Sequence, residues 1–392
     1  MQTGLSKIYL ANFLAGLSTV ASVIYTLFFL SHGISQIQIG QLFGVFMIAM
    51  SIFNIPTGAF ADSVGHKASV VIGLFFHALS GLFFYFYPTF NGMMVGMLCA
   101  GLGLALQTGA WSSLTYEVLE KEGKLDKLAE VMSRAGAYFS MAAVVGSLVG
   151  APIFKYAPRL PFLLFFICIF LSGIVVMQIK YHKPGRKPTL FGLLVTTKDG
   201  IWLTLSSQKL MGLMVLTVAM TTSRMLMNQN IIQPYQINIG IDVAMIGITA
   251  AIIQVIQTGV TAWAYKIANK VGYEVCLIMT VLSPAVAVLM MSQVSSLASL
   301  GFIFVYYAGQ AFKEPIAGFL ALKLMVPSHR ATMASTSSVL SSVVVGLLLP
   351  VGGKIIDLHG LNYALVFLSI WMVVVGGIGI AVYKLGSSDA SN

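Results

Sequence analysis

The chain has 392 residues, of which 58% are hydrophobic and only 9% are charged. A soluble domain carries about 25% charged residues, and a chain of this length could not bury so much apolar surface and keep a polar exterior. The composition therefore excludes an ordinary soluble enzyme, a nucleic-acid-binding domain and a disordered chain, although the net charge is +10. The three cysteines, Cys99, Cys168 and Cys276, lie in apolar runs and have no disulfide or metal-ligand spacing.

Long apolar runs follow one another along the whole chain. A helix needs about 20 apolar residues to cross about 30 Å of hydrocarbon, and twelve runs reach that length. Their limits are 6–31, 37–61, 68–88, 91–117, 131–154, 160–180, 208–235, 242–267, 272–293, 297–325, 332–357 and 361–384. Because backbone groups in lipid need internal hydrogen-bond partners, each run is expected to form a transmembrane helix.

The basic residues predict the orientation of these helices. If the N-terminus lies in the cytoplasm, 17 of the 22 basic residues fall on the inner side, and only Lys155, Arg159 and Lys354 fall on the outer side. Positive charge is retained on the cytoplasmic side of a membrane. We therefore expect both termini in the cytoplasm of a multi-pass protein of the cell membrane, and the net charge is no sign of nucleic acid.

One connection divides the chain into two parts. Residues 182–207 begin with a basic stretch and continue with scattered apolar residues, which predicts a cytoplasmic linker that partly lies on the membrane surface. We expect one six-helix bundle over 1–181, a second over 208–384, and a cytoplasmic tail over 385–392.

The two parts also repeat each other. Gly33-Ile34 and Ile39-Gly40 flank the start of the second run, and the same pairs flank the start of the eighth run as Gly240-Ile241 and Ile246-Gly247, at a constant offset of 207 residues. Residues 61–67 and 268–274 match at the same offset. Two parallel six-helix repeats are typical of a large class of transporters.

The loop after the second run carries a more specific motif. It reads Gly58-Ala59-Phe60-Ala61-Asp62-Ser63-Val64-Gly65-His66-Lys67. It resembles the signature loop of the major facilitator superfamily, which has a glycine, Ala-Asp, a basic residue, a second glycine and two further basic residues. Gly58, Asp62, Gly65 and Lys67 match this pattern, whereas Ser63 and His66 replace basic residues. The fifth run, with Gly146, Gly150 and Pro152, is similar to the signature of the drug/proton antiporters of this family.

The resemblance implies an all-α membrane protein with twelve transmembrane helices in two pseudo-symmetric six-helix halves, the major facilitator fold. It also implies that the signature loop acts as a cytoplasmic latch. The Asp62 carboxylate is expected near the start of the third helix, where the helix dipole favours it, with Lys67 as its partner. Glu117 and Arg134, at the inner ends of the fourth and fifth runs, are a possible gate pair or a simple interfacial ion pair. The alternative for the loop is a plain connection.

Charged residues within the runs are the strongest candidates for function, because each is costly at the bilayer centre. Arg224 lies in the seventh run, and Lys313 and Glu314 lie near the middle of the tenth. If both helices face one cavity, as the resemblance implies, Glu314 and Arg224 are close enough in depth to interact, with Glu314 as a candidate proton carrier. The alternative is a structural ion pair. Pro315 cannot donate to the carbonyl of residue 311 and predicts a kink.

Uncharged polar residues extend this candidate cavity. Thr221, Arg224 and Asn228 recur at helical spacing on one face of the seventh run. The other expected lining residues are Gln107, Trp111, Tyr25, Gln254 and Gln257. Each of them has packing between helices as its alternative role.

Together these features predict a secondary transporter that works by alternating access on a small, amphipathic or hydrophobic organic molecule. Export by proton antiport is the leading hypothesis, and uptake by a symporter or facilitator of the same fold is the alternative. A non-transporting receptor or a membrane-embedded enzyme is a more remote one, since no catalytic constellation is present. We expect a monomer in the lipid bilayer that uses protons as the coupling ion, with no cofactor, no metal site, no ATP-binding loop and no nucleic-acid partner.

Overall fold

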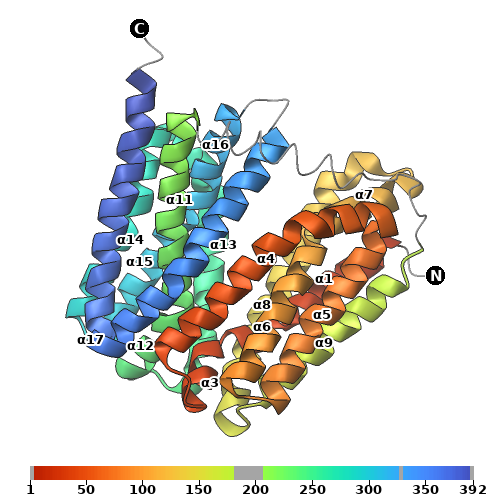
Figure 1. Ribbon diagram of the computed structural model, residues 1–392, viewed down its shortest axis with the longest axis horizontal. Helices are drawn as coiled ribbons and strands as arrows, with labels where there is room; N and C mark the ends of the chain where they lie inside the picture. Colours follow the sequence, from red (N-terminus) through yellow and green to blue (C-terminus); the bar gives the residue numbers. More distant parts are fainter. Residues whose placement is uncertain (1–3, 181–205, 326–329, 389–392) are drawn as a thin grey trace. The chain divides into compact units, whose positions relative to one another are not determined.

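The computed structural model describes residues 4–180, 206–325 and 330–388, and every regular element in these ranges is a helix. The described helices group into two compact units (Figure 1). Most of unit 1 comes from the first half of the chain and most of unit 2 from the second half. The predicted linker over 182–207 lies almost entirely outside the described residues, so the boundary between the halves stays a prediction.

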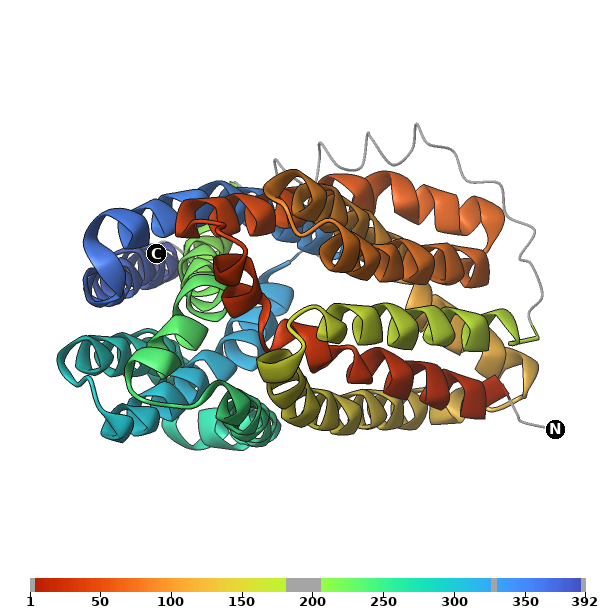
Figure 2. The same ribbon diagram turned by 90° about the horizontal axis from the view of Figure 1, so that it is seen from below.

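Unit 1 contains the helices of the first half. Their bounds are α1 Gly4–Leu17, α2 Thr19–Ser22, α3 Tyr25–Ser31, α4 Gln36–Val64, α5 His66–Phe86, α6 Phe90–Gln107, α7 Ala110–Lys121, η1 Leu125–Lys127, α8 Leu128–Tyr156 and α9 Leu160–Met177. Helix α1 packs between α8 and α9, as Figure 2 shows. The first residues of α4 are the exception, since 35–44 belong to unit 2.

Unit 2 contains the helices of the second half. Their bounds are α11 Gln208–Leu226, η2 Met227–Ile231, α12 Ile232–Asn238, η3 Val243–Met245, α13 Ile246–Val271, α14 Tyr273–Gln293, η4 Leu297–Ser299, α15 Leu300–Ala311, η5 Glu314–Gly318, α16 Phe319–Leu324 and α17 Arg330–Ser388. Helices α11 and α14 both pack against α17 (Figure 1). The start of α13 is the exception here, since 242–251 belong to unit 1.

The described residues include nine helices that are long and apolar enough to span a membrane, or ten if the bent pair α1–α2 and α3 forms one span. Two features account for the difference from twelve. Helix α17 covers two predicted runs and has a non-helical residue, Gly360, between them. The tenth run is divided among α15, η5 and α16. The number twelve therefore stays a prediction, while the all-helical multi-pass architecture is confirmed.

The internal repeat is confirmed in the backbone. Gly65 and Gly272, which are 207 residues apart, join α4 to α5 and α13 to α14 with nearly the same conformation, φ 105° and ψ 143° in the first and φ 94° and ψ 145° in the second. Residues with a side chain rarely adopt such positive φ values. The equivalent pair Gly33 and Gly240 also has positive φ values, 75° and 92°. The matched glycines therefore mark equivalent turns.

The starts of α4 and α13 make equivalent close contacts with a helix of the other half. A Cβ added at Gly40 would lie 2.5 Å from the carbonyl oxygen of Leu349, and one at Gly247 would lie 2.1 Å from that of Ser147. Asp357 accepts hydrogen bonds from the first two backbone N–H groups of α4 at 3.0 and 2.8 Å, and so satisfies donors that lack partners within the helix.

The start of α13 is held by an ion pair instead. Lys155 Nζ lies 2.8 Å from the Asp242 carboxylate, which also accepts a hydrogen bond from the backbone of Ala244. The hydrogen bond from Lys155 and the one from Ala244 lower the pKa of the Asp242 carboxyl group below its usual 3.8. Asp242 thus both caps the short helix η3 and pairs with α8.

Candidate substrate and coupling site

A pocket of about 490 Å³ lies within unit 2. It is lined by Arg224, Gln254, Gln257, Thr258, Thr261, Ala262, Gln310, Ala311, Lys313 and Glu314. These residues come from α11, from α13 and from the region where α15 ends. The volume is within the range of pockets that hold small molecules, and eight of the ten lining residues offer hydrogen bonds.

The pocket lies beside a break in the tenth predicted helix, as Pro315 predicts. Helix α15 ends at Ala311, and a π-turn follows over Glu314–Gly318. Because Pro315 has no N–H, the carbonyl of Ala311 loses its helical partner. The hydroxyl of Thr261 on α13 donates to that carbonyl instead, at 3.5 Å. A pocket residue thus compensates part of the break.

Lys313 and Glu314 form an ion pair at the break, with 2.6 Å between Nζ and Oε1. The Lys313 ammonium also donates to the Thr221 hydroxyl at 2.9 Å. The lysine side chain is 5% exposed and the glutamate side chain 72% exposed. The carboxylate therefore lies open at the pocket wall while its partner is buried.

Arg224 and Glu314 interact electrostatically, as expected, but they do not form a direct ion pair. Both residues line the pocket, but no ion pair of the described residues includes Arg224. The Nε of Arg224 is buried and has no hydrogen-bond partner in the protein. Lys313, the residue next to Glu314 in the broken helix, forms the ion pair with the carboxylate instead of Arg224.

The structure distributes the other predicted lining residues between two places. Gln254 and Gln257 lie on the pocket wall. Asn228 lies in the π-turn η2 that follows α11 and accepts a hydrogen bond from the Tyr307 hydroxyl at 2.5 Å. It is not among the lining residues of this pocket, because the π-turn changes the helical phase beyond Arg224.

The candidates in the first half lie in unit 1. Gln107 donates to the carbonyl of Gly103 at 3.0 Å, and the indole N–H of Trp111 donates to the Gln107 amide oxygen at 3.4 Å. They lie on either side of the break between α6 and α7. Tyr25 packs in an aromatic cluster and contacts Phe84 and other rings. These three residues have packing contacts, and their role in a cavity stays a prediction.

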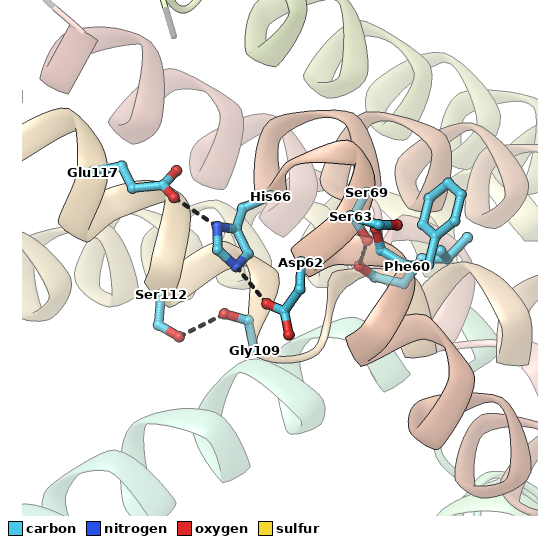
Figure 3. Close-up of polar contacts among 9 residues, drawn as sticks. Phe60, Asp62, Ser63, His66, Ser69, Gly109, Ser112 and Glu117 are labelled. Atoms are coloured by element: carbon cyan, nitrogen blue, oxygen red, sulfur yellow. Dashed lines mark hydrogen bonds and ion pairs between the residues drawn. The ribbon is translucent and has the colours of Figure 1, made fainter. Parts of the chain in front are cut away.

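The signature loop is organised around His66, one of its two departures from the family pattern. His66 Nδ1 lies 2.7 Å from Glu117 Oε1, and its Nε2 lies 3.5 Å from Asp62 Oδ1 (Figure 3). The imidazole therefore connects the end of α4 to α7, on which Glu117 lies. Both contacts are ion pairs only when the imidazole carries a proton on each nitrogen.

Two of the expected partners in this region are wrong. Lys67 does not bind Asp62, since its Nζ donates to the Ile179 carbonyl at 2.7 Å. Glu117 and Arg134 do not form a gate pair, because Arg134 binds Glu130 one turn away on its own helix, at 2.7 Å. For Arg134 the local partner is favoured, since residues four apart are neighbours on a helix.

The glycines of the motif have distinct settings. Gly65 provides the turn between α4 and α5, with its positive φ. Gly58 lies within α4, and a Cβ added there would meet nothing within 4 Å. Gly58 therefore makes no close helix contact in unit 1 as the structure describes it.

The fold defines a multi-pass helical membrane protein, and comparison with known proteins gives its family. Residues 8–344 match the family model of the Major Facilitator Superfamily, so the chain belongs to this family. An uncharacterized MFS-type transporter of Methanocaldococcus jannaschii is 23% identical over 357 residues, which is 88% of each chain. The chain is thus a membrane transporter of small molecules and not an enzyme.

Solved structures show the same fold. The nucleoside transporter NupG superposes with a TM-score of 0.81 at 13% identity over 98% of this chain and 100% of that one. A D-xylose-proton symporter superposes with a TM-score of 0.71 at 13% identity, over 97% and 96% of the two chains. At these identities the likeness establishes the major facilitator fold and leaves the substrate open.

Proposed function

We propose that this transporter is proton-coupled, that its substrate is a small organic molecule bound in the unit 2 pocket, and that Glu314 carries the proton. The observation that carries the proposal is the Lys313–Glu314 ion pair at a helix break on the pocket wall. Eight of the ten lining residues have polar side chains, which favours an amphipathic molecule with hydrogen-bonding groups over a purely hydrophobic one.

The geometry supports a mechanism for the coupling. Protonation of Glu314 removes the charge that pairs with the Lys313 ammonium. The buried lysine then keeps only neutral acceptors, the Thr221 hydroxyl and the carbonyl oxygen of the protonated Glu314, and this is unfavourable for a buried charge. The population of any conformation in which Lys313 has another partner then increases. The break between α15 and α16 is where we expect the helix to change its conformation.

Two directions of transport are each supported by one feature. The Gly146, Gly150 and Pro152 pattern, similar to that of antiporters in the family, favours export by proton antiport. The charge of the pocket favours uptake by symport as the second candidate. Arg224, Lys313 and Glu314 give the pocket a surplus of one positive charge, so protonation of Glu314 repels a cation further and attracts an anion.

We also propose that the chain lies in the cell membrane as a monomer, with both termini in the cytoplasm. The bias of 17 basic residues to three supports this orientation. An epitope added at either terminus should be cleaved by external protease in inside-out vesicles and protected in right-side-out vesicles. The reverse pattern would overturn the orientation.

The coupling is tested in proteoliposomes loaded with a pH-sensitive dye. A panel of small organic solutes is added from outside, and solute-dependent proton movement is recorded. Glu314→Gln should abolish the proton movement and leave solute exchange across the membrane intact, because the amide cannot release a proton. The control is Glu274→Gln, which removes an exposed carboxylate that pairs with Lys384 outside the pocket. Proton movement of wild-type size in Glu314→Gln would refute the role of Glu314.

A further inference from the structure

Two buried polar atoms of the pocket residues have no hydrogen-bond partner in the protein. One is the donor Nε of Arg224, and the other is the acceptor Oε1 of Gln310. They come from α11 and α15, and both residues line the same pocket. Both atoms are shielded from solvent, and buried polar groups are nearly always hydrogen-bonded in native proteins, so these groups gain partners if the two side chains turn toward a ligand in the pocket that has complementary groups.

The charge of the pocket specifies the first of these groups. The Lys313 ammonium is compensated by Glu314 at 2.6 Å, whereas no carboxylate of the described residues lies within ion-pair distance of the Arg224 guanidinium. A water molecule can accept a hydrogen bond from Nε, but it does not compensate the charge. A carboxylate does both, and its planar shape matches the guanidinium fork.

The orientation of Gln310 specifies the second group. Its amide nitrogen donates to the carbonyl oxygen of Met220 at 3.4 Å and to the Tyr306 hydroxyl at 3.3 Å. A carbonyl oxygen can only accept, so the nitrogen must face Met220, and Oε1 is fixed as the acceptor on the other side. The complementary ligand group is therefore an O–H or N–H donor.

We propose that the pocket recognises a small organic anion, with a carboxylate bound by Arg224 and a hydroxyl or amine bound by Gln310. Calling this ligand the substrate rests on the proposed function, but its binding does not. An anion bound beside Glu314 is favoured by protonation of that residue, so this substrate class supports the symport candidate over the antiport one.

The test uses the purified full chain and three carboxylates with their amides. Propionate offers the carboxylate alone, lactate adds a hydroxyl and alanine adds an amine. The neutral or cationic counterparts are propionamide, lactamide and alaninamide. Each is titrated against the apparent melting temperature, which a ligand raises by mass action. The carboxylates should raise it and the amides should not, and lactate and alanine should act at lower concentration than propionate.

Three variants assign the effect to residues. Arg224→Gln should weaken carboxylate binding about tenfold to a hundredfold, the loss of a charge-assisted contact. Arg224→Lys keeps the charge but not the planar guanidinium, so its affinity for carboxylates should lie between those of wild type and Arg224→Gln. It also tests the role of Arg224 if Arg224→Gln folds poorly. Gln310→Leu should keep propionate binding and lose the preference for lactate. The control Lys266→Gln removes one positive charge from an exposed residue on α13 outside the pocket, and should behave as wild type.

The proposal is overturned if the amides stabilise as strongly as the carboxylates, if Arg224→Gln keeps the full carboxylate response, or if no carboxylate gives a response that depends on Arg224. Failure here and failure of the proposed coupling are distinguishable. A protein that binds carboxylates through Arg224 but moves no protons refutes only the coupling. A protein that moves protons with neutral solutes alone refutes only the anion site.

Discussion

Neutralising the two members of the Lys313–Glu314 ion pair should destabilise the protein unequally. Loss of one partner from a buried pair costs about 3–5 kcal/mol when the remaining charge stays buried. Glu314→Gln leaves the ammonium of Lys313, 5% exposed, without a counter-charge. Because the Thr221 hydroxyl and the new amide oxygen still accept from it, we expect a cost of about 2–3 kcal/mol.

Lys313→Met should cost much less. It leaves the Glu314 carboxylate, which is 72% exposed, and methionine fills a similar volume in the protein. We expect a cost of about 0–1 kcal/mol, as for an exposed pair. The double variant should be less destabilised than Glu314→Gln alone, because it no longer contains the buried charge.

Thermal unfolding of the purified variants in one detergent measures this order. Glu130→Gln serves as the control, because the Glu130–Arg134 pair is exposed on both sides and should contribute less than about 1 kcal/mol. Suppose instead that Lys313→Met lowers the apparent melting temperature as much as Glu314→Gln or more. The difference in burial between the two side chains then does not determine their contributions to stability, and the proposed effect of Glu314 protonation on Lys313 is refuted.

Three further predictions concern other parts of the fold. Gly150→Ala should lower the melting temperature, because its Cβ would lie 2.1 Å from a backbone oxygen of α2. The control Gly136→Ala lies in the same helix, where a Cβ meets nothing within 4 Å, and should be neutral or stabilising. Equal effects of the two substitutions would contradict the close packing at Gly150. Asp242 has a lowered pKa, so its contribution to stability is present above its usual pKa of 3.8 and is lost as the pH falls through the folded-state value. The difference in stability between Asp242→Asn and wild type should therefore be present at about pH 6 and shrink as the pH falls below 3.8, and a difference that does not change with pH would contradict this. His66→Leu should cost about 1–2 kcal/mol, because it leaves the carboxylate of α7 unpaired, while Ser63→Ala on the exposed end of α4 should have little effect on thermal unfolding.

The architecture could be predicted because few residues determine it. Apolar runs of membrane-spanning length leave the backbone no alternative to helices, and the constant offset from Gly65 to Gly272 is enough to detect the repeat. The helix break at Pro315 follows from one missing N–H. These predictions depend on composition and spacing, which do not require the rotamers of the side chains.

The partners of the charged residues could not be predicted in the same way. Neighbours such as Lys313 and Glu314 point in different directions on a regular helix, so their ion pair becomes visible only with the π-turn that follows Ala311. His66 departs from the family motif, yet it makes the contacts between α4 and α7. Its position four residues after Asp62 was the available signal, since residues at this spacing are neighbours on a helix.

An experimental structure of the protein with a transported solute bound tests the central claim most directly. Solute density is expected in the unit 2 pocket, within hydrogen-bond distance of Arg224 and of Gln310, and close to the Lys313–Glu314 pair. Solute bound instead among Tyr25, Gln107 and Trp111, with no contact to Arg224, would contradict it.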